Sequence, residues 1–401
     1  MKSTINITQI KNGNKYPILY FSLCLISILL VSCAESKDDK KETSSGEIEH
    51  GIVFYEEGKF AGWPANNGMW NWDDEVLMGF VVSDHKDSDG AHTYDSKAAR
   101  HKYARSMDGG KTWKITDAYD IGQKGWAYDH YIDGEEVAPE ELKEGVKDFT
   151  DPDFLITFQR HNNNDGPTHF YYSQNRGNDW KGPYWFPNLG TDGVASRTDY
   201  LVNGKQDLFA FLTVAKSNKK EGRVVLSRTR DGGVSWELVS WVGPEPGKFE
   251  IMPSSVRLGS SELLTVIRAR SVDGKSSLSS YISTDNGDSW EKLENPVEDT
   301  GEGGSPPALV KMNDGRLALG YIYRSTEGSR VNVKFSKDKG RTWGKEIVLR
   351  EGDGATRDVG YPQMIQRPDG KLLMTYYWNN ALQKPDAPYR YIASTIFDPE
   401  D

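Results

Sequence analysis

Arginine side chains end two short apolar segments of this sequence. Arg268 follows Leu263–Ile267, and Arg160, itself followed by His161, comes just after Phe154–Phe158. A single arginine at a strand end is usually a solvated charge, but several that converge on one edge form a cationic site. Guanidinium groups bind carboxylate or sulfate through paired hydrogen bonds. These positions therefore predict a site for an anionic ligand if the fold brings them together.

Histidine, tyrosine and glutamate side chains could transfer protons at such a site. His85 ends an apolar run, Glu250 precedes the segment that ends in Arg268, and Tyr361 opens a later apolar segment. When arginine binds a carboxylate, the proton on the neighbouring carbon becomes more acidic, and a histidine or tyrosine can remove it. Because the same residue types also serve glycoside hydrolysis, they leave both elimination and hydrolysis open.

An internal repeat shows which elements would position these residues. Five copies of one short motif occur roughly 50 to 70 residues apart, at Ser106–Trp113, Ser173–Trp180, Thr229–Trp236, Ser283–Trp290 and Ser336–Trp343. Each copy follows an alternating apolar segment, and its Asp and Gly are typical of a tight turn. The motif resembles the Asp box (BNR repeat) of sialidase-like β-propellers, and the resemblance implies that the box is structural.

A second repeat lies between the boxes. Pro253–Arg270, Ser305–Arg324 and Tyr361–Asn380 each have the pattern of a strand, a tight turn and a second strand. An inner hairpin and an outer hairpin closed by the box make one blade. The five boxes and the box-less C-terminal segment therefore predict an all-β, six-bladed β-propeller over residues 50–401, with Ile52–Tyr55 closing the ring.

In a propeller, the first strand of every blade begins at the face to which the second strand returns. Residues at these two positions ring one central pocket, although they are far apart in sequence. The predicted ring is polar, aromatic and cationic. Its proposed substrate-binding members are Trp63, Asn66, Asn67, Arg160, Tyr377 and Trp378, with Arg197 as a carboxylate partner.

The resemblance to sialidases extends to four residues that occur in the family's order and blade context, namely Glu250, Arg268, Arg330 and Tyr361. It implies that Glu250 polarises Tyr361 and that Arg268 and Arg330 hold the substrate carboxylate. Tyrosine nucleophiles are a known exception among glycosidases. Phe60–Pro64 departs from the pattern, because it lacks the arginine near which sialidases begin.

A second departure favours another reaction. A loop with His85, His92 and His101 stands where sialidases place their acid aspartate. We therefore expect β-elimination, by a lyase or a dehydratase, at the non-reducing end of a uronic-acid oligosaccharide, sulfated or not. The candidate set of His85, His161, Tyr361, Arg197 and Arg268 resembles that of propeller-type polyuronate (ulvan-type) lyases. A sialidase-like exo-glycosidase with a Tyr361 nucleophile is the alternative, and a non-catalytic glycan-binding lipoprotein is a second alternative.

The N-terminus has the pattern of an export signal. Three lysines precede the apolar run Ile18–Val31, and the run ends in Leu-Val-Ser-Cys33, which resembles a bacterial lipobox. This predicts a signal peptide over residues 1–33, lipidation of Cys33 and a flexible tether over residues 34–49. We expect an exported lipoprotein anchored to the outer membrane, on its periplasmic or cell-surface side.

The composition of the chain limits the classes of molecule that it is expected to bind. The net charge is −10, from 49 Lys+Arg against 59 Asp+Glu, and the absence of a basic block argues against nucleic acid. Both cysteines precede residue 34, so the rest of the chain can form neither a disulfide nor a Cys-ligated zinc site. No cofactor and no metal site are predicted, although an oxygen-ligated Ca²⁺ stays open. The expected partners are an acidic oligosaccharide and a membrane, reached through the lipid anchor.

Overall fold

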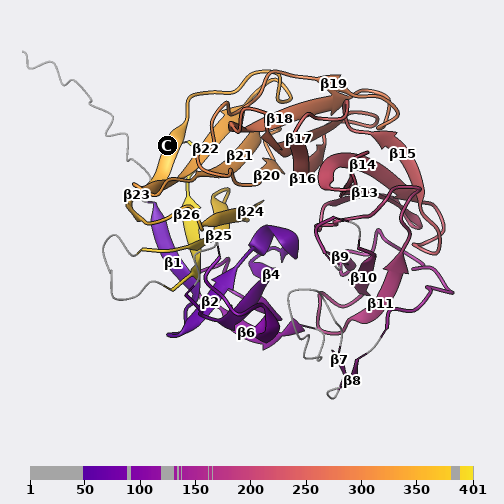
Figure 1. The fold of residues 1–401 in the computed structure, drawn as a ribbon, viewed down its shortest axis with the longest axis horizontal. Coiled ribbons are helices and arrows are strands. Elements are labelled where there is room, and N and C mark those ends of the chain that lie inside the picture. The colour runs from indigo at the N-terminus through magenta and orange to yellow at the C-terminus, as the bar shows by residue number, and fades with distance from the viewer. Residues whose placement is uncertain are drawn as a thin grey trace, which may run out of the picture. The chain divides into compact units, whose positions relative to one another are not determined.

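The fold is an all-β ring. The computed structural model describes residues 48–87, 92–118, 131–132, 135–136, 138–160, 162–164, 166–380 and 389–400, within one compact unit, Ser45–Asp401. Six antiparallel sheets follow one another around the ring as the blades of a β-propeller (Figure 1). The predicted fold class is therefore confirmed. Among the described residues, no helix is long and apolar enough to cross a membrane.

Four strands make the standard blade, ordered from the ring axis outward. Blade 1 has β2 (Lys59–Gly62) and β3 (Met69–Trp72), both paired with β4 (Glu75–Asp84), then β5 (Arg100–Ser106) and β6 (Lys114–Asp117). Blade 2 has β9 (Leu155–Arg160), β10 (Thr168–Ser173) and β11 (Lys181–Phe186). Blade 3 has β12 (Tyr200–Gly204), β13 (Asp207–Ala215), β14 (Glu221–Thr229) and β15 (Glu237–Trp241).

The second half of the ring is more regular. Blade 4 has β16 (Phe249–Arg257), β17 (Leu263–Arg270), β18 (Ser276–Ser283) and β19 (Glu291–Lys292). Blade 5 has β20 (Ala308–Lys311), β21 (Leu317–Tyr323), β22 (Ser329–Ser336) and β23 (Ile347–Gly354). Blade 6 has β24 (Gly360–Gln366), β25 (Leu372–Trp378), β26 (Tyr391–Phe397) and β1 (Glu49–Phe54). The remaining elements are the strand pair β7 (Tyr131–Ile132) and β8 (Glu135–Glu136) and two short 3-10 turns, Pro64–Asn66 and Ser96–Ala98.

The ring is closed by the N-terminal strand. β1 pairs antiparallel with β26, with Gly51 opposite Ser394, so the first strand in sequence completes the last blade. The predicted closing segment, Ile52–Tyr55, falls largely within this strand. A sheet edge with unpaired N–H and C=O groups invites aggregation, and β1 covers that edge of β26 while it joins the two ends of the ring.

Each Asp box is a hydrogen-bonded turn between the last two described strands of its blade. In blade 1, the N–H of Gly110 donates to Ser106 Oγ (2.8 Å), and the N–H of Thr112 donates to Asp108 Oδ1 (2.9 Å). The indole of Trp113 donates to the Gly110 carbonyl (3.1 Å). Both carboxylate oxygens of Asp108 accept hydrogen bonds within this turn, which supports a structural role for the box.

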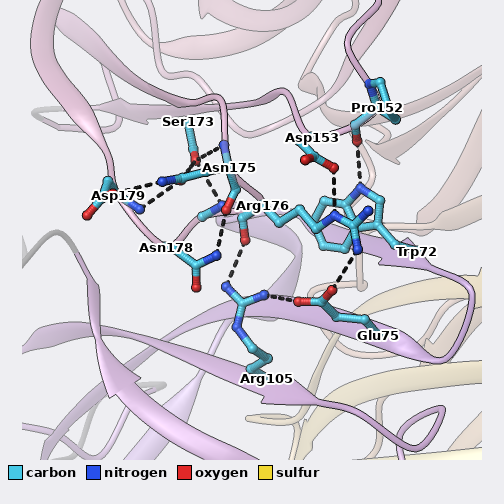
Figure 2. Close-up of polar contacts among 11 residues, drawn as sticks. Trp72, Glu75, Arg105, Pro152, Asp153, Ser173, Asn175, Arg176, Asn178 and Asp179 are labelled. Atoms are coloured by element: carbon cyan, nitrogen blue, oxygen red, sulfur yellow. Dashed lines mark hydrogen bonds and ion pairs between the residues drawn. The ribbon is translucent and has the colours of Figure 1, made fainter.

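Blades 1 and 2 are joined by a charged cluster on the Asp-box side (Figure 2). Arg176 donates to Asp153 (Nε–Oδ1 2.6 Å) and to Glu75 (Nη1–Oε2 3.0 Å), and its guanidinium lies 5.3 Å from the Trp72 ring. The indole of Trp72 donates to the Pro152 carbonyl (2.6 Å). This cluster ties β3 and β4 of blade 1 to the segment that leads into β9, where the described part of blade 2 has three strands.

Candidate functional site

Tyr361 lies at the start of β24, on the inner strand of blade 6. Its backbone has a positive φ of 54°, and its N–H donates to Ser305 Oγ (3.2 Å). Gly360 precedes it with φ 119°, and a Cβ there would lie 2.6 Å from the same Ser305 oxygen. Glycine at residue 360 thus lets the chain pass close to Ser305. The turn aims the phenol at Arg268, whose Nη1 donates to Tyr361 Oη (3.3 Å).

Four arginines, one from each of four further blades, are near enough to Tyr361 for their positive charges to affect its pKa. They are Arg160 at the end of β9, Arg197 just before β12, Arg268 near the end of β17 and Arg324 just after β21. The guanidinium carbons of Arg268 and Arg324 lie 5.9 Å and 5.4 Å from the centre of the Tyr361 ring. All these positions are strand ends at one face of the propeller. We call these four arginines and Tyr361 the arginine cluster.

The arginine cluster favours the phenolate of Tyr361. Burial alone would raise the pKa of Tyr361, but the positive charges of Arg268, Arg324, Arg197 and Arg160 outweigh it and lower that pKa below its ordinary value of 10. A lowered pKa makes the tyrosine a stronger candidate for a base or a nucleophile at moderate pH.

The arginines are held by backbone and carboxylate contacts. Arg197 forms an ion pair with Glu221 (3.0 Å), and Arg324 Nε donates to the Val359 carbonyl (2.6 Å). Arg268 donates to the Gly303 carbonyl. Among the described residues, Arg197 is the only one of these three with a carboxylate partner, so the cluster keeps positive charge available for an anionic ligand.

A buried carboxylate organises the blade 6 side of the cluster. Asp358 is 2% exposed, and its Oδ1 accepts from the Tyr377 hydroxyl (2.7 Å) and contacts His92 Nδ1 (2.7 Å). Arg390 lies 3.3 Å from Oδ2. Burial would raise the pKa of Asp358, but these cationic and hydroxyl neighbours lower it, so the carboxylate is ionised. Tyr377 in turn accepts from Arg324 Nη2 (3.2 Å), which links Asp358 to the arginine cluster.

Comparison with known proteins identifies the fold. A family model described as a BNR repeat-like domain matches residues 208–374. A protein of unknown function from Dyadobacter fermentans DSM 18053 is similar in structure, with a TM-score of 0.64 and 18% identity over 88% of this chain and 99% of that chain. No curated protein matches the chain in sequence. The fold is that of a sialidase-like BNR propeller.

Two further solved structures share this propeller. The NanB sialidase from Streptococcus pneumoniae has a TM-score of 0.55 and 12% identity, over 87% of this chain and 70% of that chain. The α-L-arabinofuranosidase Arb93A from Fusarium graminearum has a TM-score of 0.54 and 13% identity, over 88% of this chain and 99% of that chain. Enzymes with different named activities therefore have this fold, and the fold by itself does not select among them.

Several residues singled out in the sequence lie at the propeller's central face. Arg160, Arg197, Arg268 and Tyr361 belong to the arginine cluster, and Tyr377 joins it through Arg324. Trp63 is 3% exposed, and its ring packs at 5.3 Å from His92 and 6.3 Å from Tyr377. A ring so buried packs against these neighbours rather than offering a face to a sugar.

Asn66 and Asn67 form part of a buried polar layer next to Arg160. Asn67 Oδ1 accepts from Gln159 Nε2 (3.0 Å) and contacts His101 Nδ1 (2.9 Å), while the Asn66 carbonyl accepts from the N–H of Thr198 (3.2 Å). Burial, with Arg160 nearby, lowers the pKa of His101 to about 3, so this histidine is neutral. The layer connects blades 1, 2 and 3 behind the arginine cluster.

Glu250 lies elsewhere than the family resemblance implied. The Tyr281 hydroxyl donates to both of its carboxylate oxygens (3.1 and 3.0 Å), and no described contact joins it to Tyr361. In the ladder of β16 and β17, Glu250 pairs with Ala269, whereas Arg268 pairs with Ile251. Successive strand residues point to opposite faces, so Glu250 and Arg268 leave blade 4 on opposite sides. The expected Glu250–Tyr361 contact is therefore absent from the described structure.

Trp378 and Arg330 are also directed away from the phenol of Tyr361. Trp378 is fully buried and donates to Asp353 Oδ1 (3.3 Å), because alternation along β25 sends it to the side opposite Tyr377. Arg330, on the third strand of blade 5, stacks at 4.7 Å on the ring of Tyr323. Arg324, the strand-end residue of the same blade, takes the position at Tyr361 that we expected for Arg330.

The histidines divide into three cases. His85 Nε2 lies 3.1 Å from Asp87 Oδ1, and its ring packs against Tyr389, without a described contact to the arginine cluster. His161 lies outside the described residues, as does Cys33. His92 is held by Asp358 with its side chain 35% exposed, so the dyad reaches the surface of the site. Sequence reasoning saw His92 only as a member of a histidine-rich loop, since its partner lies 266 residues away.

Proposed function

We propose that this protein is a carbohydrate-active enzyme that binds an acidic sugar at the arginine cluster. The observation that carries the proposal is the set of four arginines around the phenol of Tyr361. Guanidinium groups suit carboxylate and sulfate, and a water-poor cationic site stabilises negative charge that develops in a transition state. The shared fold of a sialidase and an arabinofuranosidase agrees with action on saccharides.

Within this class we propose β-elimination on a uronic acid. The Tyr361 phenolate removes the proton from C5, next to the carboxylate, and the electron pair forms the C4–C5 double bond as the C4–O bond breaks. The departing oxygen takes a proton from His92, which Asp358 orients. Arg268 and Arg324 bind the carboxylate and stabilise the charge that it gains. The step is redox-neutral and yields an unsaturated uronate.

Sialidase-like hydrolysis with Tyr361 as nucleophile is the second candidate. The contact between Arg268 and Tyr361, together with the fold of the NanB sialidase, favours it. The pairing of Glu250 with Tyr281 weighs against it, because the carboxylate expected to polarise the nucleophile is engaged elsewhere. A glycan-binding protein without catalysis is the third candidate, and the titratable groups at the site weigh against it.

A paired assay separates these candidates. The purified protein and its Tyr361→Phe variant are incubated with uronate-terminated oligosaccharides and, separately, with a sialylated oligosaccharide. We expect ultraviolet absorbance of a conjugated uronate to grow with the unmodified protein and to fall by at least about a hundredfold in rate with the variant. Release of a saturated acidic sugar without absorbance would instead establish hydrolysis. Binding without either product would leave a glycan-binding protein.

We also propose that the protein is an exported lipoprotein, anchored through Cys33 to the outer membrane. The support is the lysine-flanked apolar run that ends at Cys33. In cells supplied with labelled palmitate, we expect the label in the full chain and its loss in Cys33→Ala. Label retained by the variant would disprove this anchor.

A further inference from the structure

A pocket lies at the edge of blade 4, beside the start of its inner strand. It has a volume of about 330 Å³. Residues of β16, β17 and β18 line it, together with Pro244, residues 246–248, residues 271–272, Lys292 and Asn295. Glu250 and Tyr281, which are 6% and 1% exposed, are two of its buried members. We call it the Glu250 pocket.

The Glu250 carboxylate has acceptor capacity to spare. A carboxylate offers about four lone-pair positions, yet among the described residues only the Tyr281 hydroxyl donates to it. Asn295 Oδ1, on the pocket wall, is buried and has no partner within the described part of the chain. Buried acceptors without donors cost free energy, so this pocket is suited to a ligand that brings hydroxyl donors.

The charge around the Glu250 pocket is complementary to an acidic ligand. Lys248, Arg270 and Lys292 line it, against the single carboxylate of Glu250. Lys248 and Lys292 are exposed, so they form its rim, and Lys292 Nζ lies 5.8 Å from the Tyr281 ring. The oxygens inside the pocket can accept hydrogen bonds from hydroxyl groups, and the cations at its rim can bind acidic groups. The pocket therefore matches a sugar that carries both kinds of group.

One aromatic ring connects the Glu250 pocket with the arginine cluster. Phe249 lines the pocket, and the guanidinium carbon of Arg268 lies 5.7 Å from its ring centre. The same carbon lies 5.9 Å from the ring centre of Tyr361. Arg268, whose side chain leaves blade 4 on the side opposite Glu250, therefore contacts both a ring that lines the pocket and the reactive phenol. Neighbouring units of one oligosaccharide could occupy the two sites.

We propose that the Glu250 pocket is a second saccharide subsite, which binds an acidic sugar unit next to the unit held at the arginine cluster, through hydroxyls donated to Glu250 and Asn295. This proposal rests on the proposed function, because it takes the ligand to be the same acidic oligosaccharide. The enzyme then prefers a substrate of at least two units, and the residue that the sialidase pattern marks as catalytic serves chain-length recognition.

Calorimetric titration tests the subsite on the Tyr361→Phe background, which prevents turnover. The ligands are glucuronic acid and a tetrasaccharide prepared from ulvan. We expect Glu250→Gln to weaken tetrasaccharide binding about tenfold or more, as for loss of a charged hydrogen-bond acceptor, and to change binding of glucuronic acid less than twofold. Glu294→Gln removes an exposed carboxylate from the same blade outside the pocket and should change neither affinity.

Other outcomes overturn the subsite. Equal loss for both ligands would place Glu250 at the central site or in the fold, and no loss for either would remove it from binding. If Glu250→Gln does not fold, as judged by circular dichroism, the exposed-rim variant Lys248→Gln must show the same selective loss. A tetrasaccharide that fails to bind the parent overturns the subsite as well. Glu250-dependent binding of the tetrasaccharide, without an elimination product from the unmodified protein, would keep the subsite and reject the reaction.

Discussion

Tyr361 and Tyr377 are neighbouring phenols whose pKa values move in opposite directions. Their ring centres are 5.9 Å apart. Burial and the adjacent Asp358 carboxylate raise the pKa of Tyr377 well above its ordinary value, whereas the arginines overcome burial and lower the pKa of Tyr361. Environments that separate two titratable groups in this way assign their protonation states. Tyr377 keeps its proton to bind Asp358, and Tyr361 is the phenol that can lose one.

The pH dependence of activity should report the Tyr361 phenolate. As a base, the phenolate makes kcat/KM rise with pH through the pKa of Tyr361, below 10. Arg268→Gln removes a positive charge that stabilises the phenolate, so this pKa should rise and the ascending limb should move to higher pH. The measurement is a pH–rate profile, with ultraviolet titration of tyrosinate as a check. An unshifted limb in the variant would contradict this role of Arg268.

Asp358 should act as a positioning residue for His92. Asp358→Asn leaves the size of the side chain and removes the charge that orients the imidazole, so we expect kcat to fall about 10- to 100-fold with KM changed far less. His92→Gln should lower kcat similarly, and the double variant should lose little more. Additive losses would show that the two residues act separately. Thermal unfolding controls for loss of the buried ion pair with Arg390.

At the scale of elements, the Asp boxes also hold neighbouring blades together. In four of the five boxes, the glycine of the turn packs against a leucine of the blade before it in the ring. The nearest leucine atoms to a Cβ built on Gly110, Gly177, Gly287 and Gly340 belong to Leu373, Leu77, Leu226 and Leu264, at 2.4, 2.5, 2.2 and 2.6 Å. The motif therefore specifies the turn within a blade and the packing between blades.

Substitution of one box glycine should measure this packing. Gly340 has φ 82°, and a Cβ there would meet Leu264, so Gly340→Ala combines backbone strain with overpacking. Gly315→Ala is the matched control, because its φ is 89° and nothing lies within 4 Å of its Cβ. We expect Gly340→Ala to cost about 1–3 kcal/mol more than the control in urea unfolding. An equal loss in the free energy of unfolding for the two variants would mean that the Leu264 side chain moves aside without strain.

The boxes should also contribute to acid unfolding. Hydrogen bonds from Ser289 lower the pKa of Asp285 to about 2. Burial would raise the pKa of Asp108, but the hydrogen bonds that this carboxylate accepts lower it to about 2 as well. A carboxyl whose pKa is lowered in the native state stabilises the fold at pH values above its unfolded-state pKa, near 4. This stabilisation is lost as the pH falls through the native pKa of about 2. The second box already has an asparagine, Asn175, at the position of this aspartate. The substitution Asp285→Asn should therefore be tolerated, and it should make Tm fall less steeply between pH 4 and pH 2. An unchanged slope would disprove this contribution.

At the scale of the whole molecule, stability depends on closing the ring. β1 supplies the last strand of blade 6, so a chain that begins at residue 55 exposes the edge of β26. We expect this truncation to lower Tm and to promote aggregation through the unpaired edge, whereas a chain that begins at Ser45 should unfold as the full chain does. Calorimetry with light scattering tests this. Equal Tm values for the two truncations would show that closure contributes little.

The candidate site was only partly predictable from sequence. Arg160, Arg268 and Tyr361 were recognised because a charged or polar residue at the end of an apolar strand has a known place in a propeller. The direction of Glu250 was not, because a strand offers two faces and the choice depends on the register of β16 against β17. The partnership of His92 with Asp358 joins a loop of blade 1 to blade 6, and no local pattern contains it.

The sequence by itself determined the ring, because the turn of an Asp box is held by hydrogen bonds within eight residues, and the five boxes with the box-less last segment give six blades. It also determined that the central face is cationic. Only the tertiary structure decided which charges meet. The lowered pKa of Tyr361 is a sum over arginines of four other blades, and Coulomb interactions depend on distances that closure of the ring creates.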